Sequence, residues 1–393
     1  MFLLAGSFGI AGAASAPPNP PPAVCMDGKC VSTPGTSSAG DARVIKWHPG
    51  VYVNPGNQKC DAAATADNLS TIEQIGDNPN VQGIHIQWKW NCLEGATPGD
   101  YSAGFARIDA YLDRLAAHGK RLILGIWPMD YGNCDDNNSS GGVYSHPSAP
   151  EYVKAHGGGA DGWISYCAPN RLYTAQMWNP QVMDRLIALS RAYAARYDSN
   201  PLVEMFSLHD ESVGLLGNAA DGFTWAAAVT QWRRYTAASV AAWSHTQVMS
   251  PINFYDSDAT IRAEYSTNYG PGLIFGTCDT LLDSVRKVPG TLVFRGLNSQ
   301  GAPQAGARDY RAVYKNWFTK IVGGQSLYQS QTPEQTWDYA YNTMHSTYIV
   351  WYRIHYNSGW PTLEWDKVWP FISAGNSPVY STECPPGWTC NTQ

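Results

Sequence analysis

Two acidic stretches of the sequence could carry chemistry, because each follows an apolar run typical of a buried β-strand. His209, Asp210 and Glu211 directly follow one such run, and Asp279 follows another. The carboxyl ends of parallel strands meet at one end of a barrel, so these side chains are expected to converge. Two carboxyl groups that flank a bond can act as a general acid and as a nucleophile or base. Glu211, Asp279 and Asp210 are therefore the candidate catalytic residues.

Aromatic and polar side chains follow the same kind of predicted strand. The sequence has 16 Trp and 23 Tyr but only 10 Phe, so rings with a polar group outnumber purely apolar rings. Such rings suit a surface that contacts something flat and polar, such as the face of a sugar. The candidate substrate-binding residues are Trp47, His48, Trp88, Trp90, Trp127, His209, Asn253, Gln325 and Trp351.

Each of these candidates also has a purely structural interpretation. A single tryptophan at a strand end can simply pack against the end of a barrel. Glu94 is expected to fix a loop, and His48 and His209 are expected to be hydrogen-bonding partners. Asp210 can instead face the barrel wall as a structural residue.

The elements that must position these residues follow one pattern from residue 43 to 375. Short apolar runs alternate with longer amphipathic runs, and about eight such units in one domain predict a closed (β/α)8 TIM barrel. A doubly wound sheet is less favoured because no Gly-rich turn follows the first strand. Strands are predicted at 44–47, 81–90, 121–127, 202–208, 247–253, 272–278 and 348–352, with an apolar run at 291–297. Helices are predicted at 105–118, 180–198, 223–243, 307–319 and 334–345.

The chain ends differ in composition from this central region. Residues 1–16 are apolar and end in small residues, as a secretory signal does, although a start-site remnant is an alternative. Residues 17–42 are rich in Pro, Ser and Gly and are interpreted as a linker, and residues 376–393 form a Cys-bearing tail. We expect a secreted monomer, and no apolar stretch is long enough to predict a membrane partner.

Nine cysteines agree with an oxidising compartment. The pairs Cys25 with Cys30 and Cys384 with Cys390 can close small loops. Longer bridges can join Cys60 to Cys92 and Cys134 to Cys167, which leaves Cys278 free. Connectivity stays open at this point, because sequence alone does not fix it.

Composition and missing motifs exclude several other classes. Charged residues make up 15% of the chain and the net charge is −6 with no basic stripe, so nucleic acid is not an expected partner. No cofactor or metal is expected, because no histidine pair or CxxC motif has ligand spacing. Serine hydrolase chemistry is disfavoured because no G-x-S-x-G motif occurs.

Three stretches carry a resemblance to clan A glycoside hydrolases. WNCLEGATPGDYSAGFARIDAYLDRLAAHGKRLILGI, residues 90–126, resembles their segment from the second to the third strand. NPLVEMFSLHDES, 200–212, resembles the fourth strand, where an Asn-Glu pair supplies the acid/base, so Glu211 matches the glutamate and Asp210 replaces the asparagine. TYIVWYR, 347–353, resembles the eighth strand, whose tryptophan on the substrate floor matches Trp351. The resemblance covers roughly 43–375 and implies a barrel that hydrolyses a polysaccharide or oligosaccharide.

The resemblance lacks one catalytic element, the glutamate that ends the seventh strand. If that strand is 319–324, the matching position is near Gln325, and if it is 292–297 the end is Asn298. Asp279 is the nearest alternative, as a nucleophile at about 5–5.5 Å from the acid or as a base at about 6.5–9.5 Å. Two hypotheses follow, a secreted glycoside hydrolase and a catalytically inactive carbohydrate-binding barrel.

Overall fold

The computed structural model divides the chain into residues 1–42 and residues 43–393. In the first unit, β1 (Cys25–Met26) and β2 (Lys29–Cys30) form an antiparallel pair in which Cys25 lies opposite Cys30. The structure describes residues 25–26, 29–30, 43–56, 59–128, 148–155, 164–167, 172–209, 222–251, 271–277, 280–283, 288–297, 303–308, 318–321, 332–343, 345–353 and 364–393.

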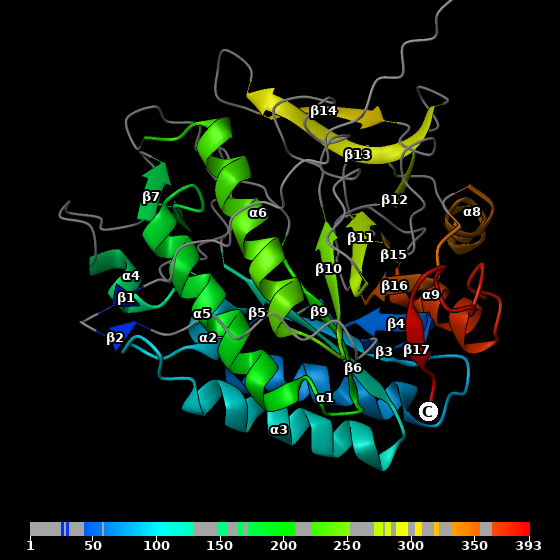
Figure 1. Ribbon diagram of the computed structural model, residues 1–393. Helices are drawn as coiled ribbons and strands as arrows, with labels where there is room; N and C mark the ends of the chain where they lie inside the picture. Colours follow the sequence, from blue (N-terminus) through cyan, green and yellow to red (C-terminus); the bar gives the residue numbers. More distant parts are fainter. Residues whose placement is uncertain are drawn as a thin grey trace, which may run out of the picture. The chain divides into compact units, whose positions relative to one another are not determined.

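Eight parallel strands form a closed barrel in the second unit (Figure 1). They are β4 (Gly50–Asn54), β5 (Gly83–Lys89), β6 (Arg121–Trp127), β9 (Val203–Ser207), β10 (Gln247–Pro251), β11 (Leu273–Thr277), β15 (Phe318–Ile321) and β16 (Tyr348–Tyr352). Each strand pairs with the next in chain order, and β16 pairs with β4 to close the ring. The predicted (β/α)8 TIM barrel is confirmed, and β15 identifies 319–324 as the correct choice for the seventh strand.

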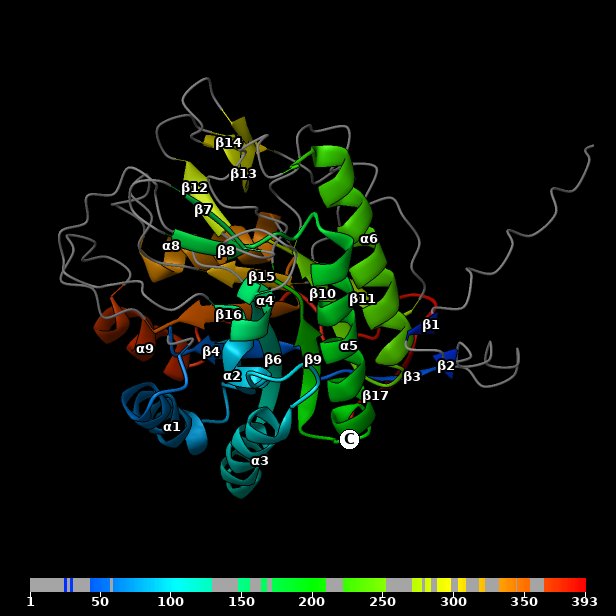
Figure 2. The same cartoon turned by 90° about the vertical axis from the view of Figure 1, so that its left-hand side faces the viewer.

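Helices surround the barrel on the outside (Figures 1 and 2). The described ones that follow barrel strands are α1 (Ala62–Gly76), α3 (Ser102–Ala117), α5 (Pro180–Tyr197), α6 (Trp225–Ala242), α8 (Pro333–Asp338) and α9 (Trp365–Ser373). A π-helical turn, η2 (Tyr339–Thr343), continues α8. In both views α5 and α6 run side by side. The predicted helices 105–118, 180–198, 223–243 and 334–345 are confirmed.

Local sequence signals start these helices. Asp61 accepts a hydrogen bond from the backbone N–H of Ala64, and Thr224 caps α6 in the same way. Asn179 caps α5, with Pro180 at its first position. These side chains satisfy backbone donors that the first helical turn leaves free. Gly119, at φ +63°, ends the α3 region in a left-handed conformation suited to glycine.

Side chains of the barrel strands alternate between two apolar layers. The outer layer packs strands against helices and includes Ile84, Ile86 and Trp88 of β5. The inner layer fills the barrel and includes Tyr52, Ile123, Met249 and Val350 among its members. Because successive side chains of a strand point to opposite faces, this pattern fixes which residues face the barrel interior.

Several predicted elements lie outside the barrel. The predicted first strand, 44–47, is β3 (Val44–Lys46), which pairs with the C-terminal strand β17 (Thr389–Asn391) instead. The apolar run 291–297 belongs to β13 (Val288–Leu297), between β12 (Thr280–Asp283) and β14 (Pro303–Arg308) in an antiparallel sheet. The predicted helix 307–319 is wrong at both ends, which lie in β14 and β15.

The region between β6 and α5 contains short elements of regular structure in the parts that the structure describes. Its described parts are α4 (Glu151–Ala155) and a hairpin of β7 (Ile164–Cys167) and β8 (Leu172–Ala175). Another short helix, α2 (Trp90–Leu93), follows β5 directly.

Two disulfides join described cysteines as predicted. Cys60 is bonded to Cys92, which ties the start of α1 to α2. Cys384 is bonded to Cys390 in the C-terminal tail. Cys134 and Cys278 lie outside the described residues.

Candidate active site at the mouth of the barrel

Inward-facing polar side chains occupy the carboxyl ends of several strands, where barrels of this kind hold their sites. Asn54 ends β4, Gln87 lies near the end of β5, and His209 follows β9. All three are buried, at 4%, 3% and 1% relative exposure. The strand alternation places them on the inside, and we call this region the mouth.

Hydrogen bonds across the interior hold these side chains in place. Asn54 Nδ2 lies 3.3 Å from His85 Nδ1, and Tyr352 donates its hydroxyl proton to Gln87 Oε1 at 3.1 Å. Gly125 leaves room for Gln87, since a Cβ at Gly125 would stand 2.4 Å from Gln87 Cγ. The mouth is thus lined by amide and imidazole groups suited to hydroxyl-rich ligands.

Trp127 and His209 are the two predicted site residues that the structure brings together at the mouth. The indole of Trp127 meets the imidazole of His209 edge to face, with ring centroids 4.3 Å apart. Trp127 is partly exposed whereas His209 is buried. The contact leaves part of the indole at the surface and fixes the histidine directly after β9.

Trp88 and Trp351, predicted at the mouth, instead face the surrounding helices. Trp88 is fully buried and meets Tyr111 of α3 edge to face. Trp351 is 1% exposed, packs against Phe371 of α9 and donates its indole N–H to Ser377 Oγ at 3.0 Å. Their predicted placement is wrong because each occupies the outward phase of its strand.

Tyr352 occupies the inward position that the sequence interpretation gave to Trp351. It is partly exposed, packs against the inner layer and bonds Gln87. The sequence interpretation also missed Asn54, because it placed the first strand too early in the chain. In β5, by contrast, polar His85, Gln87 and Lys89 alternate visibly with apolar residues, so the inward face could be read directly.

Trp90, also predicted at the mouth, is a buried anchor for the loop after β5. Its indole N–H donates to Glu94 Oε2 at 2.7 Å, and the backbone N–H of Gly99 donates to Glu94 Oε1 at 2.7 Å. Arg185 of α5 completes an ion pair with the same carboxylate. Burial, with Glu94 nearby, raises the pKa of Tyr101 to about 12. The prediction that Glu94 fixes a loop is confirmed, and the placement of Trp90 at the mouth is corrected.

Trp47 and His48 lie at the amino end of the barrel, before β4. Trp47 is 1% exposed, and its ring meets Tyr348 and Trp388 edge to face. Its indole N–H donates to the carbonyl of Thr382 at 2.9 Å. Their predicted place at a mouth-side strand end is therefore wrong, because β3 leads into the barrel and is not one of its strands.

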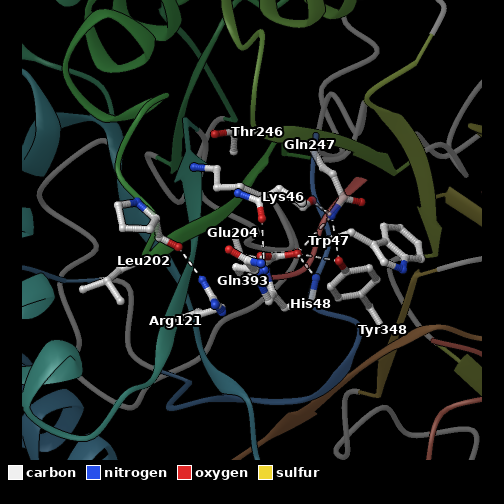
Figure 3. A network of polar contacts seen from close by, with 12 residues as sticks. Lys46, Trp47, His48, Arg121, Leu202, Glu204, Thr246, Gln247, Tyr348 and Gln393 are labelled. Carbon is white, nitrogen blue, oxygen red and sulfur yellow. Dashed lines mark hydrogen bonds and ion pairs between the residues drawn. The ribbon is translucent and has the colours of Figure 1, made fainter. Parts of the chain in front are cut away.

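A buried carboxylate organises this amino end, which we call the base (Figure 3). His48 donates its backbone N–H to Glu204 Oε1 at 2.8 Å, and His48 Nδ1 lies 2.7 Å from Oε2. Tyr348 donates its hydroxyl proton to Oε1 at 2.5 Å and Gln247 donates to it at 3.1 Å. Glu204 is fully buried, and its four contacts come from three residues, in β10, in β16 and in the segment before β4.

A β-bulge explains how β9 presents Glu204 to the interior. Leu122 pairs with Val203 and Ile123 pairs with Met205, so Glu204 is an extra residue in the register. The inner layer includes Met205, and Tyr348 of that layer bonds Glu204. Such a bulge interrupts the alternation and lets two consecutive residues serve the same side.

The remaining predicted site residues lie outside the described residues: Glu211, Asp210, Asp279, Asn253 and Gln325. Their roles stay predictions. In the sequence, Glu211 comes two residues after His209 and Asp279 comes two residues after the end of β11.

The described part of the chain contains no group of three or more His, Cys, Asp or Glu side chains arranged to hold a metal ion. Within the same residues no helix is long and apolar enough to cross a membrane.

Comparisons with solved structures find matches at low sequence identity. Endo-glycoceramidase II from Rhodococcus sp., a lactosyl-enzyme intermediate, matches at 14% identity and TM-score 0.40 over 60% of this chain. Exo-beta-1,4-mannosidase Op5Man5 from Opitutaceae bacterium strain TAV5 matches at 13% identity and TM-score 0.49 over 88%. This chain covers 59% and 62% of those two chains, less than two thirds of their lengths. No family model and no curated protein matches the sequence.

Removing the Glu204 carboxylate is expected to destabilise the protein strongly. Glu204→Ala leaves donor groups of His48, Tyr348 and Gln247 without their acceptor, and each donor left unsatisfied in a buried site costs about 1–3 kcal/mol of unfolding free energy. Urea unfolding measures this loss. Glu73→Ala is the control, because Glu73 is 49% exposed and its pair with Arg114 is worth less than about 1 kcal/mol. Equal effects of both substitutions would contradict the role assigned to Glu204.

Lys46, next to the base, is expected to make stability rise in mild alkali. Burial lowers its pKa to about 8, against the opposing effect of Asp198 and Glu204. Above that pH the folded protein loses a proton that the unfolded chain retains up to its ordinary value of 10.5, so unfolding becomes less favourable as pH rises. Between pH 8 and pH 10 the free energy of unfolding of the wild type should rise by on the order of 1–3 kcal/mol relative to that of Lys46→Met.

Chemical unfolding at several pH values checks the behaviour of Lys46. Lys367→Met, which removes an exposed lysine of α9, serves as the matched control and should leave the pH dependence unchanged. A parallel pH profile for wild type and Lys46→Met would refute the expectation.

Proposed function

We propose that the protein is a glycoside hydrolase that acts on a polysaccharide or oligosaccharide. The observation that carries the proposal is the pairing of Trp127 with His209 at the mouth, directly before Asp210 and Glu211 in the chain. A partly exposed indole offers a sugar a flat apolar face.

Glu211 acts in this proposal as the general acid, with Asp279 as the second carboxylate. Glu211 gives its proton to the glycosidic oxygen as the bond to the anomeric carbon breaks. Asp279 either attacks that carbon, forming an intermediate that water later hydrolyses, or removes a proton from the water that attacks. In both routes one water molecule is consumed and two sugar hydroxyl groups are produced. Asp210, in the position before the acid, helps to keep Glu211 protonated through its negative charge.

A catalytically inactive carbohydrate-binding barrel is the second candidate, and the seventh strand favours it. With β15 now placed at Phe318–Ile321, the sequence from 318 to 332 contains no Asp or Glu. Stacking and hydrogen bonding at the mouth do not require a second carboxylate, whereas hydrolysis does.

Export and a monomeric state belong to the same proposal. The signal-like residues 1–16 and the Cys60–Cys92 and Cys384–Cys390 disulfides support an oxidising compartment. An extracellular or periplasmic site would give the protein access to polymeric carbohydrate.

Substituting the two carboxylates separates the two candidate functions. Glu211→Gln and Asp279→Asn should each lower kcat by at least about a hundredfold, because each removes a group that moves a proton or attacks in the reaction. Release of reducing ends from a panel of plant and microbial polysaccharides measures this. Glu334→Gln, an exposed carboxylate of α8, should retain full activity. Retention of the wild type on an affinity gel without release from any polysaccharide would favour the binding protein.

Tyr352, and not Trp351, should contribute to substrate binding from the eighth strand. Tyr352→Ala removes the inward ring and should raise KM about tenfold, since a lost ring contact is worth about 0.5–1.5 kcal/mol. Tyr352→Phe keeps the ring and should bind almost normally. Trp351→Phe should lower the melting temperature through lost packing and leave KM unchanged. A KM effect confined to Trp351→Phe would contradict this assignment.

A further inference from the structure

A group of four aromatic side chains lies on the outer helix layer, away from the mouth. It consists of Trp337 in α8, Tyr341 in η2, His345 just before β16 and Tyr380 after α9, and we call it the aromatic platform. His345 and Tyr380 stack nearly parallel at 4.0 Å. Tyr341 lies 5.7 Å from Tyr380 and 5.2 Å from Trp337. Because His345 precedes β16, the platform stands on the base side of the barrel.

Tyr380 is exposed but rigidly held. The residue is 47% exposed, and Val44 is the other exposed large hydrophobic residue among those that the structure describes. Three hydrogen bonds hold its segment, namely Trp351 to Ser377 Oγ at 3.0 Å, Trp337 to the carbonyl of Pro378 at 2.9 Å, and the Tyr380 N–H to the carbonyl of Ser346 at 2.9 Å. An exposed ring that is fixed in advance loses little conformational freedom when it binds a ligand.

His345 supports the stack from an unfavourable backbone conformation. Its φ of +51° is the one positive value among the described residues other than glycine. Histidine adopts the left-handed region more readily than most residues, but at an energetic cost. Local strain of this kind is concentrated at functional positions. Here it turns the exposed imidazole onto Tyr380, with the Ser346 N–H bonded to the carbonyl of Ala340.

The chemistry around the platform suits an uncharged ligand with a flat apolar face. Glu334 and Asp338 lie on α8, the helix that carries Trp337, and are exposed, so this helix would repel an anionic polymer. Tyrosine, tryptophan and histidine rings combine an apolar face with a polar edge, which matches a sugar ring with its C–H face and peripheral hydroxyl groups.

We propose that the aromatic platform is a second carbohydrate-binding site that holds a neutral polysaccharide chain without cleaving it. The choice of ligand rests on the proposed function, whereas the platform itself does not use the mouth. Such a site would keep the protein on a polymer while the mouth engages another part of the chain, which raises the effective concentration of substrate.

Electrophoresis in gels that contain barley β-glucan, galactomannan, arabinoxylan or polygalacturonate tests the platform. At least one of the three neutral polymers should retard the wild type. Retardation by the anionic polygalacturonate and by no neutral polymer would contradict the proposal. Tyr380→Ala should weaken that binding about tenfold, as expected for one lost ring contact. Tyr380→Phe keeps the ring and should bind normally.

His345→Asn is the matched variant for the strained residue. Asparagine tolerates the same left-handed backbone, so the substitution removes the imidazole while preserving the local fold. This variant should weaken retention in the gel as much as Tyr380→Ala does. It provides an independent test of the platform if Tyr380→Ala does not fold. The melting temperature of each variant verifies folding.

The outcomes also distinguish the platform from the proposed function. Retardation that is equal in wild type, Tyr380→Ala and His345→Asn overturns the platform, as does the absence of retardation by any neutral polymer. Release of reducing sugar from short oligosaccharides depends on the mouth and should be the same in all three proteins. If the wild type releases no reducing sugar, the proposal that the protein is a hydrolase is refuted, whereas the proposal about the platform is not affected.

Discussion

Closure of eight parallel strands into a ring is the constraint on which the rest of the structure depends. A closed ring has only an inside and an outside, and the period of two along each strand assigns every side chain to one of them. In β16 this makes Tyr348, Val350 and Tyr352 inward and Ile349 and Trp351 outward. Aromatic content alone therefore does not make a binding site. The phase of each strand decides which rings can meet a ligand.

The two ends of the ring use polar groups in opposite ways. At the base, Glu204 is fully buried and surrounded by donors from three separate segments, so both of its carboxyl oxygens have hydrogen-bond partners at fixed positions. At the mouth, Asn54, Gln87 and His209 are side chains that can donate or accept, next to the partly exposed Trp127. The base joins three segments of the chain through one carboxylate, whereas the mouth combines hydrogen-bonded amide and imidazole groups with one partly exposed indole. This agrees with the general division between stability at one end and chemistry at the other.

Sequence patterns predicted the barrel well, because its strands and helices differ in period and length. The bounds of β6 and β16 agree with prediction at both ends. Which residues of β16 face inward was not predictable. Its residues are apolar or aromatic on both faces, so the alternation of polar and apolar residues that marks an inward face is missing. The first strand was misplaced because Val44 to Trp47 is as apolar as a barrel strand, although its partner is the C-terminal tail. A pairing between strands at opposite ends of the chain leaves no pattern in the local sequence from which it could be predicted.

The geometry of the ring also bears on the proposed reaction. The candidate acid follows β9 and the candidate partner follows β11, and one strand, β10, lies between them. Neighbouring strands are about 4.8 Å apart, so two strands separated by a third stand about 10 Å apart at their ends. Carboxylates that retain configuration are about 5–5.5 Å apart, whereas those that invert are separated by about 6.5–9.5 Å to admit water. Side chains extend several ångströms inward from the strand ends, so this strand spacing is compatible with either separation of the Glu211 and Asp279 carboxylates, and the strand order alone does not choose between the two routes. Because residues 318–332 contain no Asp or Glu, the second carboxylate of a hydrolase must come from another strand, and Asp279 after β11 is the candidate that the sequence offers.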